Sequence, residues 1–163
     1  MKKPGSRATR AASVVMVAAS MSLMATVAFA PPSGAVTSGG ITVRVGTAKV
    51  HANILVTVPV RVVCASFGGT WVTDSIQVNL LQANGNSVSS GTEYLGRGGV
   101  YGTGSPLFVC DGTTLNVIRV PVLPNAGSGP FNPGQAVITV TVNHAESTGG
   151  ASATLGPKVV TLS

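Results

Sequence analysis

Apolar and polar residues alternate with a period of two along most of the chain beyond its first quarter. In the segment 54–64 the even positions are all Ile, Val or Cys, whereas the odd positions include Thr57, Pro59 and Arg61. Because successive side chains of a β-strand point to opposite faces, this pattern predicts a strand whose buried face ends at Cys64. The same alternation recurs at 41–45, 76–80 and 138–142.

Turn-forming residues separate these segments, and three shorter apolar runs, at strand-like spacing. The runs lie at 107–110, 115–122 and 159–162. Glycine next to Asn or Asp, as in Asn84-Gly85 and Asp111-Gly112, is typical of a tight turn. No segment beyond residue 40 combines helical periodicity with caps. We therefore expect an all-β fold, an antiparallel β-sandwich of seven or eight strands.

The pattern also constrains three local details of the sheets. In the segment 115–122 the apolar residues occupy odd positions up to Val117 and even positions from Ile118 onward. A β-bulge would allow both sets to face the core. Pro59 and Pro121 cannot donate to a ladder, so each should face a sheet edge or a bulge. The small and polar residues at 147–153 predict a loop.

The first segment, 1–30, has the composition of an export signal. Four basic residues stand among its first ten, and an apolar stretch rich in small residues follows. A membrane anchor of the same length is the alternative interpretation. Cleavage is expected between Ala28 and Ala35, which leaves no stable membrane anchor. We then expect a flexible leader at 31–40 and the β-sandwich domain at 41–163.

Removal of the signal lowers the expected net charge of the chain, and export determines the compartment in which its cysteines are expected. Six basic and four acidic residues remain, so the net charge falls from +6 to near +2. No basic run or basic–aromatic interleaving indicates a nucleic-acid partner. Cys64 and Cys110 form an even pair in an exported chain, which predicts one disulfide in a secreted, extracellular protein. Two buried free thiols are the alternative.

The cysteines invite a comparison with immunoglobulin domains, where a Trp packs on the disulfide between the sheets. Trp71 follows Cys64 by only seven residues, which is short for that arrangement. Phe108, rather than Tyr, lies two residues before Cys110, so the tyrosine corner is missing as well. The pattern predicts a β-sandwich but not a true immunoglobulin domain.

Groups that could support catalysis or hold a metal are few. A metal site would need His51 and His144 to converge with a carboxylate such as Glu146, and we expect each histidine at a strand end in solvent. Two Asp and two Glu residues make a positioned acid–base pair unexpected, and no Gly-x-Ser-x-Gly elbow is present. We therefore predict that the chain is not an enzyme and binds no cofactor. We also predict that it has no catalytic, metal-binding or cofactor-binding residues.

The segment 91–104 is the most unusual part of the chain. Six of its fourteen residues are glycine, and Tyr94, Arg97 and Tyr101 lie among them, a combination used by adaptable binding loops. An irregular edge strand whose tyrosines cover the core is the alternative. Trp71 is either a sugar-stacking platform or a core residue. These four side chains are the candidate partner-binding residues.

Three arginines stand in mid-strand between β-branched residues: Arg44, Arg61 and Arg119. Their side chains should point outward, but alternation does not say which strands pair. If the three strands share a sheet, the arginines would form a basic stripe that attracts anionic wall polymer. Keeping the sheet soluble and its edges unpaired is the alternative role.

Three motifs look like those of a family of small exported actinobacterial proteins with no assigned activity. They lie at 58–64 (VPVRVVC), 110–113 (CDGT) and 130–136 (PFNPGQA). The resemblance covers most of the predicted domain and implies an Ig-like sandwich outside the cell. It supplies no functional residues.

The sequence thus predicts a secreted, non-enzymatic β-sandwich that binds a partner or forms part of an extracellular layer, with an extracellular protein or a cell-wall polymer as the partner. A carbohydrate-binding module using Trp71, Tyr94 and Tyr101 is one alternative. A protein-binding or inhibitory module using 91–104 is another. A small secreted hydrolase would require a histidine beside both a carboxylate and a serine.

Overall fold

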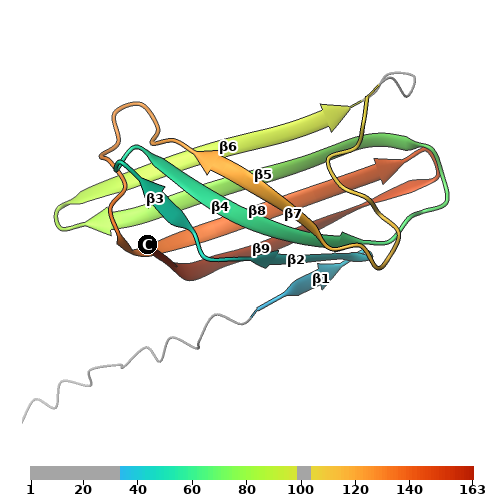
Figure 1. Ribbon diagram of the computed structural model, residues 1–163, viewed down its shortest axis with the longest axis horizontal. Helices are drawn as coiled ribbons and strands as arrows, with labels where there is room; N and C mark the ends of the chain where they lie inside the picture. The colour runs from blue at the N-terminus through green and yellow to red at the C-terminus, as the bar shows by residue number, and fades with distance from the viewer. Residues whose placement is uncertain (1–33, 99–103) are drawn as a thin grey trace, which may run out of the picture. The chain divides into compact units, whose positions relative to one another are not determined.

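The computed structural model describes residues 34–98 and 104–163, and within them it contains nine β-strands and no helix (Figure 1). Accordingly, no helix in the described part is long and apolar enough to cross a membrane. The expected signal at 1–30 lies outside the described residues. The strands are β1 (Val36–Ser38), β2 (Ile41–Val45), β3 (Lys49–His51), β4 (Leu55–Cys64), β5 (Trp71–Asn84), β6 (Ser87–Gly98), β7 (Asn116–Val122), β8 (Gly134–Glu146) and β9 (Gly149–Leu162).

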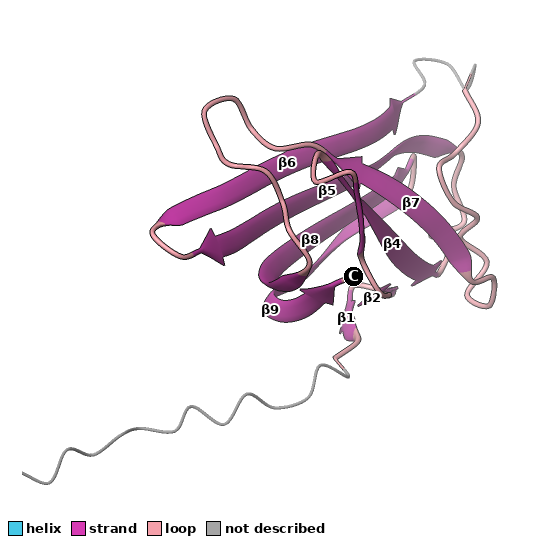
Figure 2. Ribbon diagram, turned by 60° about the vertical axis from the view of Figure 1, so that its left-hand side comes forward, coloured by secondary structure: helices cyan, strands magenta, loops and turns pink. Residues whose placement is uncertain are grey.

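The strands form two antiparallel sheets. In one sheet β4 is central, with β7 on one side and β2, then β1, on the other, where β3 also pairs with its first residues. The second sheet has the order β6-β5-β8-β9. The two sheets lie one over the other, as Figures 1 and 2 show from two directions. This confirms the all-β sandwich, with nine strands rather than seven or eight.

The core lies between the sheets and is built from the inward faces that alternation predicted. Val56, Val58, Val60 and Val62 of β4 have no exposed surface. They pack with the equally buried inward residues of β5 and β8 and with Phe131. Each fully buried aliphatic side chain contributes roughly 1.5–3 kcal/mol relative to exposure. The period-two pattern therefore marks the residues that stabilise the sandwich.

Along one side of the sandwich, hydrogen bonds join the two sheets. The end of β9 runs parallel to the chain that enters β3, with a bridge between Ala48 and Leu162. The Val50 N–H donates to the Ser163 carbonyl at 2.8 Å, and the Ser163 N–H donates to the Ala48 carbonyl at 3.1 Å. These bonds occupy backbone groups that would otherwise form an open sheet edge.

Three expectations about local structure were wrong. Val36–Ser38 belong to β1, paired with β2 through a turn at Gly39 and Gly40, so part of the expected leader is strand. The expected loop at 147–153 is only a short turn, because pairing with β8 draws the small residues from Gly149 onward into β9. The apolar run at 107–110 forms no strand.

The alternation in β7 has a simpler cause than a bulge. Ile118, Val120 and Val122 face inward, and the register with β4 is unbroken. Leu115 and Val117 are instead apolar residues on the outer side, 56% and 52% exposed. The apparent change of parity therefore reflects aliphatic side chains on a solvent-facing surface.

The two prolines occupy different places. Pro121 lies on β7, at the edge of its sheet, as expected. Pro59 lies in the central strand β4, opposite Arg119, where the neighbour on the other side changes from β2 to β3. At this break its carbonyl accepts a hydrogen bond from Gly46 N–H at 2.8 Å. The missing N–H of Pro59 therefore leaves no ladder bond unmade.

The predicted disulfide is confirmed. Cys64, the last residue of β4, is bonded to Cys110, which lies 46 positions later in the sequence, and the two Cα atoms are 4.6 Å apart. The Gly112 N–H also donates to the Cys64 carbonyl at 2.8 Å. The bond therefore fastens the irregular connection between β6 and β7 to the end of the central strand.

Candidate functional site

The candidate partner-binding residues do not form one surface within the described part of the chain. Tyr101 lies outside the described residues. Tyr94 is 62% exposed on β6 and pairs with Gln77 on the outer side of the second sheet. Trp71 is half-buried at the start of β5, its indole nitrogen is enclosed, and it pairs with Glu146, whose side chain is buried. Trp71 and Tyr94 therefore do not line up as a common platform.

The first half of the Gly-rich segment is a regular edge strand. Residues 91–98 belong to β6 and pair with β5 without a register shift. A Cβ on Gly91 would lie 2.5 Å from the Leu123 carbonyl oxygen, and one on Gly96 would lie 2.6 Å from the Tyr94 ring. Arg97, near the strand end, donates to the Ser105 carbonyl at 3.4 Å. Close packing thus accounts for these glycines.

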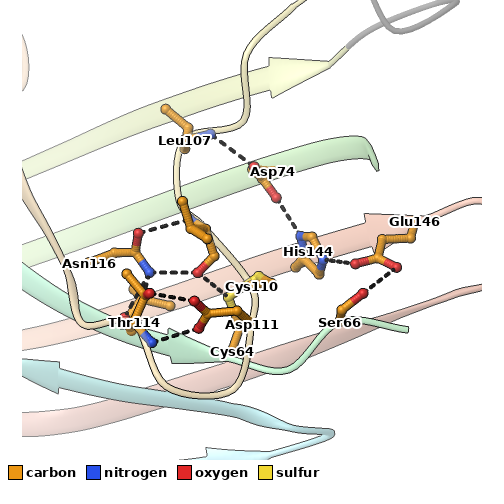
Figure 3. The surroundings of a disulfide bond; sticks show 12 residues. Cys64, Ser66, Asp74, Leu107, Cys110, Asp111, Thr114, Asn116, His144 and Glu146 are labelled. Atoms are coloured by element: carbon orange, nitrogen blue, oxygen red, sulfur yellow. Dashed lines mark hydrogen bonds and ion pairs between the residues drawn. A yellow bond between two sulfur atoms is a disulfide. The ribbon is translucent and has the colours of Figure 1, made fainter. Parts of the chain in front are cut away.

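A buried cluster of ionisable groups lies between the sheets, near the disulfide (Figure 3). His144 of β8 pairs directly with Asp74 of β5, and its Nδ1 lies 2.6 Å from Asp74 Oδ1. On the other side its Nε2 lies 3.1 Å from Glu146 Oε1. The three side chains are 3%, 0% and 6% exposed, respectively. The expectation that His144 lies in solvent was wrong, whereas His51 is exposed at the end of β3.

Both carboxylates of this cluster have further hydrogen-bond donors. Asp74 Oδ2 accepts from Leu107 N–H at 2.9 Å. Glu146 Oε2 accepts from Gly69 N–H at 2.7 Å, from Phe67 N–H at 3.0 Å and from the Ser66 hydroxyl at 3.1 Å. Burial by itself raises the pKa of Glu146, but the bonds from Gly69, His144, Ser66 and Phe67 outweigh it and hold the pKa at about 2.

The geometry suits this cluster to a structural role. Both ring nitrogens of His144 face carboxylates, and the rings of Phe67 and Phe108 lie 6.0 Å from its centre. The imidazole therefore has no free nitrogen with which to take a proton from a substrate. His144 instead links two connecting segments. Through Glu146 it is linked to the chain after β4, and through Asp74, which accepts from Leu107, to the connection after β6. Among the described residues, no group of three or more ligands is arranged to hold a metal.

Only part of this cluster could be recognised from the sequence. His144 and Glu146, two residues apart on one strand, share a face, and that spacing is visible in the sequence. Asp74 is 70 residues away from His144. Only the pairing of β5 with β8 brings it to the ring.

A second concentration of charge lies on the outer side of the five-stranded sheet. We call this surface the basic face, and it carries Arg44, Lys49, His51, Arg61 and Arg119. Arg44 of β2 lies directly opposite Arg61 of β4. Lys158 of β9 joins Arg61 at the rim. The three predicted arginines therefore do share one sheet and point outward.

The acidic residues of the domain lie elsewhere. Asp74 and Glu146 belong to the buried cluster, and Glu93 lies on β6 in the other sheet. Asp111 is held in its own turn, where hydrogen bonds from Thr114 and then Thr113 keep its pKa well below the usual range. The ion pairs found in the described residues are those of His144. No carboxylate of the described domain neutralises the basic face.

Shallow hollows shape the basic face, and Arg61 lines three of them. One contains Arg44 with the aliphatic Val63 and Leu115. Another contains Lys49, Arg119 and Pro59. Cationic side chains therefore alternate with apolar patches across this side of the sandwich. The unexplained outward-facing aliphatic residues of the β7 region belong here.

No protein-family model matches the chain, and no curated protein matches its sequence.

Proposed function

We propose that this chain is an exported, Ig-like β-sandwich that acts by binding, and that its basic face holds an anionic polymer outside the cell, at the cell wall. One observation carries the proposal. Five of the six Lys and Arg residues of the described domain border this face, and its four carboxylates are placed elsewhere. The five cations are Arg44, Lys49, Arg61, Arg119 and Lys158.

The placement of the charges favours a ligand over a purely solubilising role. Arg44 and Arg61 are directly opposite each other across two strands, and like charges in that position destabilise a sheet. An anion bound to Arg61 would weaken that repulsion. Cations of one sign also raise the local concentration of anionic partners and speed their encounter. Because the side chains stand on paired strands, little backbone ordering is needed on binding.

The buried cluster lacks the contact between serine and histidine on which the hydrolase alternative depends. The Ser66 hydroxyl donates to Glu146, not to His144, so the serine has no histidine base. In a nucleophilic triad the histidine accepts the serine proton on a free ring nitrogen. Here Asp74 and Glu146 face both nitrogens. The hydrolase alternative therefore lacks its central contact.

The two aromatic alternatives have weaker support. A sugar-binding platform would need Trp71 and Tyr94 in line on one exposed side, and they are not. A projecting loop at 91–104 would need a segment free of the sheet, whereas its first eight residues are strand. The basic face, by contrast, is already formed in the structure.

Binding can be tested with the mature protein and immobilised poly(glycerol phosphate), a linear polyanion. We expect retention at low salt and release at about 1 M salt, where the Debye length is about 3 Å. Arg61→Gln should weaken retention about tenfold, as loss of a charge-assisted hydrogen bond does. Arg97→Gln removes the same charge from the other sheet and should have no effect. Equal retention of both variants, or no retention of the unmodified protein, would overturn the proposal.

Export is tested separately. The disulfide is compatible with an extracellular protein, and the composition of 1–30 supports a cleaved signal. N-terminal sequencing of protein from culture supernatant should begin between Phe29 and Val36. Recovery only as an uncleaved membrane form would contradict export.

A further inference from the structure

We infer that the basic face contains one defined site for a phosphate-type oxyanion, the hollow around Pro59. This inference rests on the proposed function and deepens it, because it identifies the anionic polymer as one with phosphodiester groups. The Pro59 hollow is lined by Thr47, Lys49, His51, Thr57, Pro59, Arg61, Val117 and Arg119.

Three cations from three strands surround Pro59. Arg119 of β7 lies directly across from it, and Arg61 follows it by two residues on the same side of β4. Lys49 of β3 pairs with Thr57, the residue two positions before Pro59. Two residues along a strand span about 7 Å, so the cations stand within reach of one small anion. This convergence depends on the pairing of both β3 and β7 with β4.

Short side chains form the floor between the cations. Pro59 presents only its ring. Thr47 and Thr57 add hydroxyl groups to the lining. The result is a hollow of about 440 Å³ rimmed by long cationic side chains. That volume accommodates a phosphate together with the groups that flank it in a polymer, as pockets of 300–1,000 Å³ do for small ligands.

The arrangement of donors fits a tetrahedral oxyanion better than a carboxylate. A carboxylate has two oxygens in one plane and is satisfied by the fork of a single Arg. Lys49, Arg61 and Arg119 approach from three sides, which matches oxygens that point in several directions. Lysine also binds phosphate as a point charge.

Arg44 provides a control on the same face. It shares a different hollow with Arg61, Val63 and Leu115, and it is not part of the Pro59 hollow. A general attraction to the whole face would use Arg44 as much as Arg119. A defined site would not.

The test measures affinity for soluble poly(glycerol phosphate) by calorimetry at low salt. Single variants Lys49→Gln, Arg119→Gln, Arg44→Gln and Arg97→Gln each remove one charge from the mature protein. We expect about tenfold weaker binding for Lys49→Gln and Arg119→Gln, the loss of one charged hydrogen bond. Arg44→Gln should weaken binding less than threefold, roughly the effect of diffuse screening alone, and Arg97→Gln not at all. Thermal unfolding checks that each variant is folded.

A second arm replaces the polymer by polygalacturonate of equal charge density, a carboxylate polyanion. The site predicts at least tenfold preference for the phosphodiester. Equal affinity for both polymers, or an equal loss for Arg44→Gln and Arg119→Gln, would overturn the Pro59 site while leaving the basic face as the binding surface. If no basic-face variant changes the affinity, both the site and the proposed function are wrong.

Discussion

The buried cluster and the basic face contain most of the charged side chains of the domain. Among the described residues, charges are paired in the buried cluster and unpaired on the basic face. Between the sheets, His144 faces a carboxylate on each side, and the carboxylates accept further backbone donors. On the outer side, Arg44 and Arg61 face each other with no carboxylate near them in the described domain.

The difference indicates which charges hold the fold and which are available for a partner. A buried charge that lost its partner would cost several kcal/mol, so every group in the cluster is paired. An exposed charge costs little to leave unpaired, because water solvates it. Unpaired cations gathered on one side are therefore a feature that folding does not require. Substitutions in the two regions test this division.

Replacing His144 should produce the largest loss of stability. His144→Leu leaves the Asp74 and Glu146 carboxylates against an apolar side chain, which should lower the free energy of unfolding by about 3–5 kcal/mol. His51→Leu, at an exposed histidine, should change it by less than about 0.5 kcal/mol. Urea unfolding at neutral pH measures both. A loss below about 1 kcal/mol for His144→Leu would mean that the cluster does not hold the fold.

Removing the disulfide should have the next largest effect. Cys64→Ala/Cys110→Ala opens a loop of 46 residues and should cost about 2–4 kcal/mol. The disulfide and the Leu107–Asp74 hydrogen bond fasten the same connection, so the loss should be less than additive with His144→Leu. Polymer affinity of the folded double variant should stay unchanged. A loss of affinity would show that the connection supports the basic face.

Acid should weaken the cluster before it affects the basic face. The pKa of Glu146 is lowered from 4.5 to about 2 on folding, so its carboxylate stabilises the fold above pH 4.5. That contribution is lost as the pH falls through about 2. Glu146→Gln should therefore flatten the decline of melting temperature between these values. Glu93→Gln, outside the cluster, is the control, and an identical profile for both variants would exclude Glu146 as the cause.

The smallest effect separates the basic face from the cluster most sharply. Arg61→Gln removes the repulsion from Arg44 and should raise the free energy of unfolding by about 0.2–1 kcal/mol at low salt, while polymer binding falls. About 1 M salt should abolish the gain, since it screens charges beyond about 3 Å. Arg97→Gln should leave polymer binding unchanged and, because Arg97 stands opposite Asp74, should not raise the free energy of unfolding. Destabilisation by Arg61→Gln would place Arg61 among the residues that hold the fold.

Much of the fold could be predicted from local pattern. Alternation identified the inward faces of β2, β4, β5 and β8. The presence of two cysteines in the expected exported domain predicted the disulfide that the structure contains. Prediction was poorer for β6 and β9. Glycine and small polar residues lower the intrinsic preference for strand in 91–98 and 149–153, and pairing with β5 and β8 overrides that preference.

The candidate sites depended on what alternation cannot express. A period of two determines which side of a sheet a residue occupies, so the outward direction of Arg44, Arg61 and Arg119 followed from the sequence alone. Which residue stands opposite another depends on strand order and register, which arise from pairings between distant segments. Only the tertiary structure therefore placed Arg44 against Arg61 and Asp74 against His144, because both neighbours are made by strands far apart in the chain.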